Sequence, residues 1–199
     1  MGSLRVEAAA VERECGLAPG TIRERAGIES VSRAEGGEDE VVLGQRAAEQ
    51  ALRAADANPE EVDFVVATSA TFLQLPSLSA VLHNRLLLRE SCGALDVGGA
   101  CVGLLNALGT AKGLLAMSGR RRALVVAAEV HSRRLASPQV PGEFRGLFGD
   151  GACAFVLTRH AAGEGNDALC LGEFIWGCAG SYASSLQLAL RSEGALDVQ

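Results

Sequence analysis

A cysteine in a run of small residues is the position in this sequence best suited to covalent chemistry. Cys101 follows Gly98, Gly99 and Ala100, between a short apolar run typical of a strand and a long apolar run typical of a helix. The first turn of a helix offers unpaired N–H groups and a partial positive charge, which favour the nucleophilic thiolate. The small residues leave room for a substrate. The alternative is a buried thiol that packs as a small hydrophobic residue, and spacing alone leaves both open.

A second candidate is the turn formed by Gly149, Asp150 and Gly151. Two glycines around an aspartate permit positive φ and a tight turn. Such a turn either forms an active-site loop or simply precedes a strand. The six cysteines lack CxxC or Cys/His spacing, so no metal site is predicted.

Alternating strands and helices must position these residues. Strands are expected at residues 62–69, 94–97, 123–129, 152–158 and 169–176, and helices at residues 41–57, 76–89 and 102–118. Such alternation implies parallel pairing with right-handed crossovers. The last two strands have no helix between them, so at least one pair is expected to be antiparallel. The prediction is a layered α/β domain with a mixed sheet of about five strands.

The helix over residues 102–118 is apolar nearly all round, and Lys112 is its only charge. This pattern predicts a helix buried in a core. Gly103, Gly109 and Gly113 are expected to allow close packing of another element.

Composition excludes several classes of protein. Hydrophobic residues make up 48% and charged residues 21% of the 199, and the formal net charge is −6. This rules out a disordered chain, and an acidic chain is a poor candidate for binding duplex nucleic acid. No targeting signal is found, and the apolar stretches are expected to end short of the ~18 residues of a membrane span. The cysteines predict small, buried, reduced thiols in a cytoplasmic protein.

Taken together, these segments resemble the type III β-ketoacyl-acyl-carrier-protein synthases, which have the thiolase fold. The resemblance covers nearly the whole chain. The matching segments, in order, are Gly27-Ile28, the helix from Val41, residues 66–71, Pro76-Ser77, Asp96-Val97 with Cys101, residues 127–129 and residues 147–152.

The resemblance implies a thiolase-like αβα half-domain and an acyltransferase. Cys101 would accept an acyl group from a coenzyme A thioester. The acyl group would then condense with a malonyl-carrier protein by decarboxylation. The family would use no metal and no cofactor beyond the coenzyme A thioester as substrate.

Further site residues follow from the same resemblance. Gly149, Asp150 and Gly151 would lie in the loop beside the cysteine, and Arg25 would lie near the coenzyme A entrance. Leu75 would lie on a loop at a homodimer interface and reach the partner's acyl pocket. The turn over residues 120–122, with three arginines, is either a solvated turn or a docking point for an acidic carrier protein.

Three departures from the family pattern limit what is expected of this chain. The family's first strand is absent or reduced to residues 4–6, and Thr21 replaces a tryptophan that often stacks on coenzyme A. The catalytic His and Asn lie in a second half, and none of His83, His131 and His160 has that context. Residues 1–199 are therefore interpreted as one amino-terminal domain: a lead-in over 1–40, a core over 41–160, and over 161–199 the start of a linker to the second half.

The prediction is thus a ketosynthase whose isolated chain does not condense, completed by a homodimer or a complementary half. One alternative is a non-catalytic partner subunit of the same fold. Another is a thiolase or a hydroxymethylglutaryl-CoA-synthase-like acyltransferase. Acyl chain length and pathway (fatty acid, polyketide or quinolone-type) cannot be read from the sequence.

Overall fold

The computed structural model describes residues 1–137, 140–160, 169–184, 188–190 and 196–198, which fall into two compact units. The first unit contains Met1–Glu38, Val130–Gly151 and Trp176–Gln199, and the second contains Asp39–Glu129 and Ala152–Ile175. Each unit is described by itself. The division of the sequence into lead-in, core and linker remains a prediction.

A four-stranded sheet forms the centre of the second unit. Its strand order is β4 (Gly93–Asp96), β3 (Phe64–Thr68), β5 (Arg122–Glu129) and β6 (Gly151–Thr158). Strand β3 pairs in parallel with both β4 and β5. Strand β6 lies on the other side of β5. Cys153 lies against Ala127, and the Arg159 N–H donates to the Arg121 carbonyl. Residue numbers therefore increase in opposite directions along the two strands. Strand β6 is therefore antiparallel to β5, and the predicted mixed sheet is confirmed.

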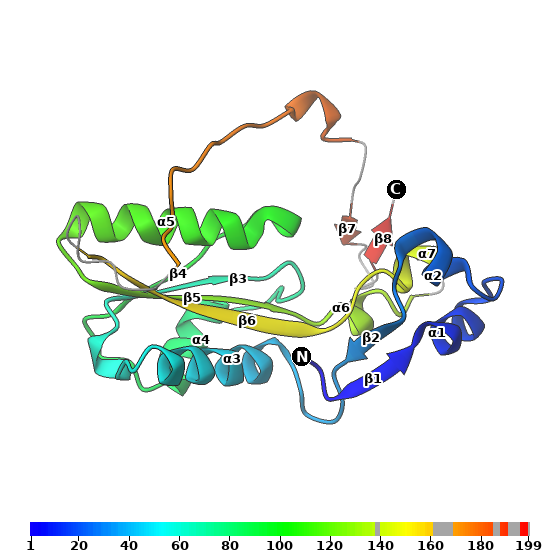
Figure 1. Ribbon diagram of the computed structural model, residues 1–199, viewed down its shortest axis with the longest axis horizontal. Helices are drawn as coiled ribbons and strands as arrows, with labels where there is room; N and C mark the ends of the chain where they lie inside the picture. Colours follow the sequence, from blue (N-terminus) through cyan, green and yellow to red (C-terminus); the bar gives the residue numbers. More distant parts are fainter. Residues whose placement is uncertain (138–139, 161–168, 185–187, 191–195, 199) are drawn as a thin grey trace. The chain divides into compact units, whose positions relative to one another are not determined.

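Helices cover both faces of this sheet (Figure 1). Helices α3 (Glu40–Ala54) and α4 (Leu78–Arg85) pack on one face, and α5 (Gly103–Ser118) packs on the other. Side chains alternate along β3, so Val65 and Ala67 join the α3/α4 core whereas Val66 joins the α5 core. The layered αβα arrangement predicted from the sequence is confirmed.

Polar caps set where the helices of this unit begin. The Asp39 carboxylate accepts the Val42 N–H at 2.8 Å and caps the start of α3. Ser77 caps α4, and Asp96 at the end of β4 accepts the N–H groups of Leu78 and Ser79 at 2.9 and 2.8 Å. Asp96 thereby joins the carboxyl end of β4 to the start of α4.

Helix α5 is buried on only one side, which corrects the prediction of a helix enclosed in a core. Ala107, Ala111 and Leu115 are buried, whereas Leu105 is 56% exposed and Met117 is 88% exposed. The sheet covers only the face that it contacts, and no further layer lies over the other face among the described residues of this unit. The stretch Ala100–Met117 is also long and apolar enough to cross a membrane by length and composition alone, contrary to prediction. Core helices of soluble proteins meet the same test.

The predicted fifth strand of the sheet is wrong, because residues 169–176 form no regular secondary structure. The segment crosses α5 (Figure 1) and does not extend the sheet. The Lys112 ammonium donates to the carbonyls of Leu171 and Gly172 and lies 5.7 Å from the centre of the Phe174 ring. These contacts use backbone groups that a strand would pair with its neighbour.

The first unit is built on an antiparallel strand pair. Its elements are β1 (Leu4–Glu7), α1 (Ala8–Cys15), α2 (Thr21–Ala26), β2 (Ser30–Arg33), α6 (His131–Arg134), α7 (Gly142–Arg145), η3 (Gly180–Tyr182), β7 (Leu188–Leu190) and β8 (Leu196–Val198). Strand β1 pairs with β2, and β7 pairs with β8. Helices α6 and α7 are single short turns of four residues each. The buried Glu12 accepts the N–H groups of Gly20 and Ile22 at the start of α2.

Candidate active site

Cys101 lies in a single 3-10 turn, η2 (Ala100–Val102), that leads directly into α5. The preceding backbone takes unusual conformations, with φ of 142° at Gly99 and 46° at Ala100. A residue with a Cβ at positive φ costs about 1–3 kcal/mol, and such strain concentrates at functional sites. The cysteine is exposed, so the alternative of a buried core thiol is wrong.

The carboxyl ends of three parallel strands meet where Cys101 is placed. Ala67 pairs with Asp96 on one side of β3, and Thr68 pairs with Ala127 on the other. The segments that follow β3, β4 and β5 therefore begin at the same end of the sheet, where the strands have their carboxyl ends. In open α/β sheets, ligands bind at this end, where the chain turns to opposite faces.

Two contacts fix the turn that carries Cys101. Asn106 Nδ2 donates to the Gly98 carbonyl at 3.0 Å and so ties the turn to the first part of α5. A Cβ at Gly103 would lie 2.4 Å from Thr68 Oγ1, so only glycine allows α5 to start against the end of β3. Close packing is confirmed at Gly103, but a Cβ at Gly113 would meet nothing within 4 Å.

Glu129 organises the loop after β3. Its carboxylate accepts the Ala70 N–H at 2.9 and 3.0 Å, the Thr71 hydroxyl at 3.1 Å and the Ser69 hydroxyl at 3.4 Å. This loop continues to Leu75. In the sequence, residues 127–129 stand out only as part of the family resemblance. A carboxylate directly after a buried apolar strand is the signal that could have given Glu129 a role.

The Gly149–Gly151 turn belongs to the first unit and has a structural explanation. Asp150 is buried, and its carboxylate accepts the N–H groups of Ala34 at 2.7 Å and Ser132 at 2.8 Å. A Cβ at Gly149 would lie 3.2 Å from the backbone N of Ser32. Neither Gly149 nor Gly151 has a positive φ. The close approach of the Ser32 backbone therefore accounts for the glycine at position 149.

The remaining candidates are both on the surface. Arg25 donates to Glu143 at 2.5 Å, and both side chains are largely exposed. Leu75 is 93% exposed. Leu75 and Cys101 lie in the second unit, whereas Arg25 and the Gly149–Gly151 turn lie in the first.

The other thiols differ from the predicted buried set. Only Cys92 is buried, Cys15 is half-buried, and the remaining four cysteines are exposed. Burial raises the pKa of the Cys92 thiol to about 11, so Cys92 is a poor nucleophile.

No histidine or metal cluster in the described residues adds to the candidate site. His83 Nε2 lies 3.1 Å from the Arg89 carbonyl. The His131 ring lies 4.8 Å from that of Phe148 in the first unit, and His160 is exposed after β6. Among the residues described, no group of three His, Cys, Asp or Glu side chains could hold a metal ion.

A layered α/β chain with an exposed cysteine beyond the carboxyl ends of its parallel strands has features of the thiolase fold. Residues 95–172 match the family model for 3-oxoacyl-[acyl-carrier-protein] synthase III. The chain is 40% identical over 164 residues to a 3-oxopimeloyl-[acyl-carrier-protein] synthase of Rhodothermus marinus, an alignment covering 81% of this chain and 46% of that protein. The chain therefore spans about half the length of this curated relative.

Solved structures agree with these matches. A 3-oxoacyl-(acyl carrier protein) synthase III from Pseudomonas aeruginosa superimposes with a TM-score of 0.84 at 26% identity, covering 98% of this chain and 60% of that one. A priming β-ketosynthase of a polyketide biosynthetic pathway gives 0.83 at 28% identity, covering 100% and 59%. The chain thus resembles the type III ketosynthases over part of the length of these proteins. The match favours this class over the thiolase and hydroxymethylglutaryl-CoA-synthase-like alternatives.

Proposed function

We propose that this chain is the acyl-accepting part of a type III β-ketoacyl-acyl-carrier-protein synthase, with Cys101 as the nucleophile. The observation that carries the proposal is the exposed thiol of Cys101 in the turn at the start of α5. The thiolate attacks the thioester carbonyl of an acyl-CoA. A bond forms between the Cys101 sulfur and the acyl carbon, the bond to coenzyme A breaks, and coenzyme A leaves as a thiol after taking up a proton.

The second step in this proposal is condensation with a malonyl-carrier protein. Loss of CO₂ leaves a carbanion that attacks the acyl carbon, and the Cys101 thiolate is released. The enolate that develops needs hydrogen-bond donors, each worth ~2.7–4 kcal/mol of barrier. We assign that role to a His and an Asn outside these 199 residues, since His83, His131 and His160 have other settings. These residues alone are therefore proposed to be acylated but not to condense.

The exposed face of α5 supports a proposed partner. Leu105 and Met117 are among the large apolar side chains that this face leaves open, and a contiguous exposed patch of this kind marks an interface. We propose that a complementary half, or a second copy of the chain, covers it. Arg25 and Leu75 keep their proposed roles at the coenzyme A entrance and in the acyl pocket, and Gly149, Asp150 and Gly151 in the loop beside the cysteine. Cytoplasmic location is part of the same proposal.

Acylation can be tested directly on the purified chain. Incubation with a short acyl-CoA, followed by peptide mass spectrometry, should place the acyl group on Cys101. Cys101→Ser should abolish this labelling. Cys178→Ser is the matched control, because Cys178 is also exposed and should not matter. Absence of an acyl group on Cys101, or equal acylation of the other exposed cysteines, would rule out the proposal.

A further inference from the structure

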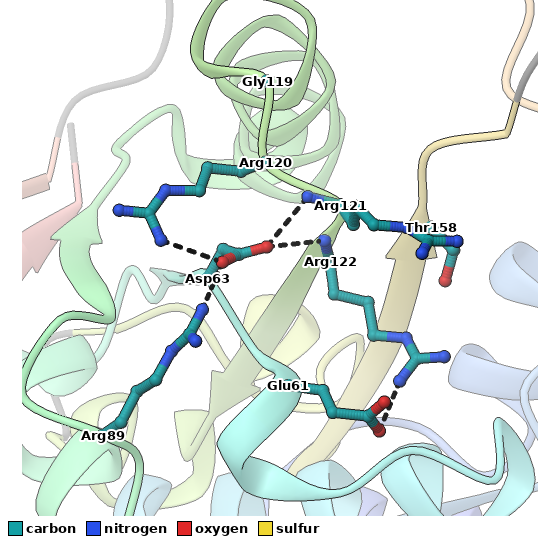
Figure 2. Close-up of a pocket in the computed structure, with 8 residues that line it drawn as sticks. All are labelled: Glu61, Asp63, Arg89, Gly119, Arg120, Arg121, Arg122 and Thr158. Atoms are coloured by element: carbon teal, nitrogen blue, oxygen red, sulfur yellow. Dashed lines mark hydrogen bonds and ion pairs between the residues drawn. The ribbon is translucent and has the colours of Figure 1, made fainter.

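A cavity of about 370 Å³ (Figure 2) lies at the amino-terminal ends of β3 and β5. Cys101 lies beyond the carboxyl ends of the parallel strands, at the opposite end of the sheet. The walls of the cavity come from the segments that lead into β3 and β5, from the loop after α4 and from the turn after α5. The charged side chains around it are Glu61, Asp63, Arg89, Arg120, Arg121 and Arg122. Four arginines against two carboxylates leave a surplus of two positive charges on a chain whose net charge is −6.

Asp63 holds this arrangement together. Its side chain is only 8% exposed and accepts the backbone N–H groups of Arg121 and Arg122 at 2.8 and 3.0 Å. The guanidinium groups of Arg89 and Arg120 also donate to it (Figure 2). Burial by itself would raise the pKa of Asp63, but these hydrogen bonds and the charge of Arg89 outweigh it and hold the pKa below its ordinary value. The carboxylate is therefore ionised and neutralises one arginine.

Several guanidinium N–H groups around the cavity do not donate to Asp63. The Nε atom of Arg89 is buried and has no hydrogen-bond partner among the described residues, which is costly for an ionised group. The Arg121 guanidinium makes no hydrogen bond or ion pair to a described side chain, since only its backbone N–H reaches Asp63. Arg122 uses one of its guanidinium nitrogens to pair with Glu61 at 2.5 Å. The carbonyls at the end of α5 add a partial negative charge, which is smaller than the surplus of two positive charges.

We propose that this cavity binds a small molecule through its phosphate group. Arginine guanidinium groups bind phosphate through pairs of parallel N–H bonds. The cavity volume lies at the lower end of the range for small-molecule sites. The donors line a concave space and not a broad face, which favours a small phosphate-bearing ligand over the acidic surface of a carrier protein. This site is separate from the one proposed for acyl transfer and does not depend on it.

Titration calorimetry of the whole chain tests the proposal. The probes are inorganic pyrophosphate and ADP, with adenosine as the phosphate-free control. Both phosphates should bind and adenosine should not. Tighter binding of ADP than of pyrophosphate would identify a nucleotide as the source of the phosphate, and equal binding would show that the phosphates suffice.

The key variant is Arg121→Gln, which keeps the backbone N–H that Asp63 accepts and so should fold. It should weaken pyrophosphate binding about tenfold, as expected for one charge-assisted hydrogen bond. Arg53→Gln is the matched control, because Arg53 is an exposed arginine on α3 outside the cavity and should leave the affinity unchanged. Absence of phosphate binding, an unchanged affinity in Arg121→Gln, or binding only to an acidic carrier protein would overturn the proposal.

Discussion

Replacement of Asp63 by alanine is expected to destabilise the second unit strongly. Asp63 lies just before β3 and accepts backbone N–H groups from the start of β5. Removal of the carboxylate leaves these two N–H groups and the Nη2 of Arg89, which donates to Asp63, without that acceptor. The substitution thus removes hydrogen bonds between the starts of β3 and β5 and does not touch the candidate active site.

The cost can be worked from these contacts. Two hydrogen bonds to a charged acceptor contribute about 1.5–3 kcal/mol each. The two ion pairs involve Arg89 and Arg120 side chains that are 37% and 45% exposed, so each adds only about 0–1 kcal/mol. Asp63→Ala should therefore lower the free energy of unfolding by about 3–8 kcal/mol. For a chain of this size that lowers Tm by about 6–32 °C.

Urea unfolding and thermal melting at about pH 7 provide the measurement. Asp63→Asn keeps one oxygen acceptor and should lose about half as much. Glu60→Ala is the control, because Glu60 is an exposed acidic residue three positions away. The folded-state pKa of Asp63 is lowered from 3.8. The stabilisation is therefore fully present above that value, and it is lost as the pH falls through the folded-state pKa. A loss in Asp63→Ala below about 1 kcal/mol, or an equal loss in Glu60→Ala, would refute this reasoning.

The remaining predictions concern the thiols, the chemistry and the exposed helix face. Limited iodoacetamide treatment with peptide mapping should label Cys101 fastest of the six cysteines and Cys92 slowest. The labelling rate of Cys92 should rise as the pH approaches 11, because its thiolate then forms. Equal labelling rates for Cys101 and Cys92 would contradict this. A condensation assay with malonyl-carrier protein should show no product from the chain alone, and turnover at an ordinary rate of ~1–10³ s⁻¹ would contradict it. Sedimentation equilibrium at micromolar concentration should show self-association that Leu105→Asp weakens, with the surface variant Arg53→Gln as control; a monomer that binds no hydrophobic dye would contradict it.

Local signals predicted most of the second unit. Short β-branched runs became β3 and β5, and β4 and β6 also lie close to their expected positions. The predicted helix starts at residues 41 and 76 lie within two residues of the starts of α3 and α4, because caps depend only on nearby backbone N–H groups. The layered arrangement followed from the alternation of strands and helices.

The errors in the predicted fold arose where the same apolar sequence pattern is compatible with more than one structure. Residues 169–176 were expected to pair as a strand, but Lys112 and α5 take up their backbone carbonyls and Phe174. Helix α5 was expected to be enclosed, yet the sheet covers one face only. Periodicity reports which residues are apolar but not how many layers are present to cover them.

For the candidate site, the sequence by itself singled out Cys101, because a cysteine after three small residues and before an apolar helix is a local pattern. Only the tertiary structure decided that Cys101 is exposed, that Gly103 must be glycine against Thr68, and that Glu129 holds the loop after β3. It also showed that Asp150 serves as a buried acceptor for backbone N–H groups of Ala34 and Ser132. These roles depend on contacts between segments far apart in the chain, which strand register fixes and residue spacing does not.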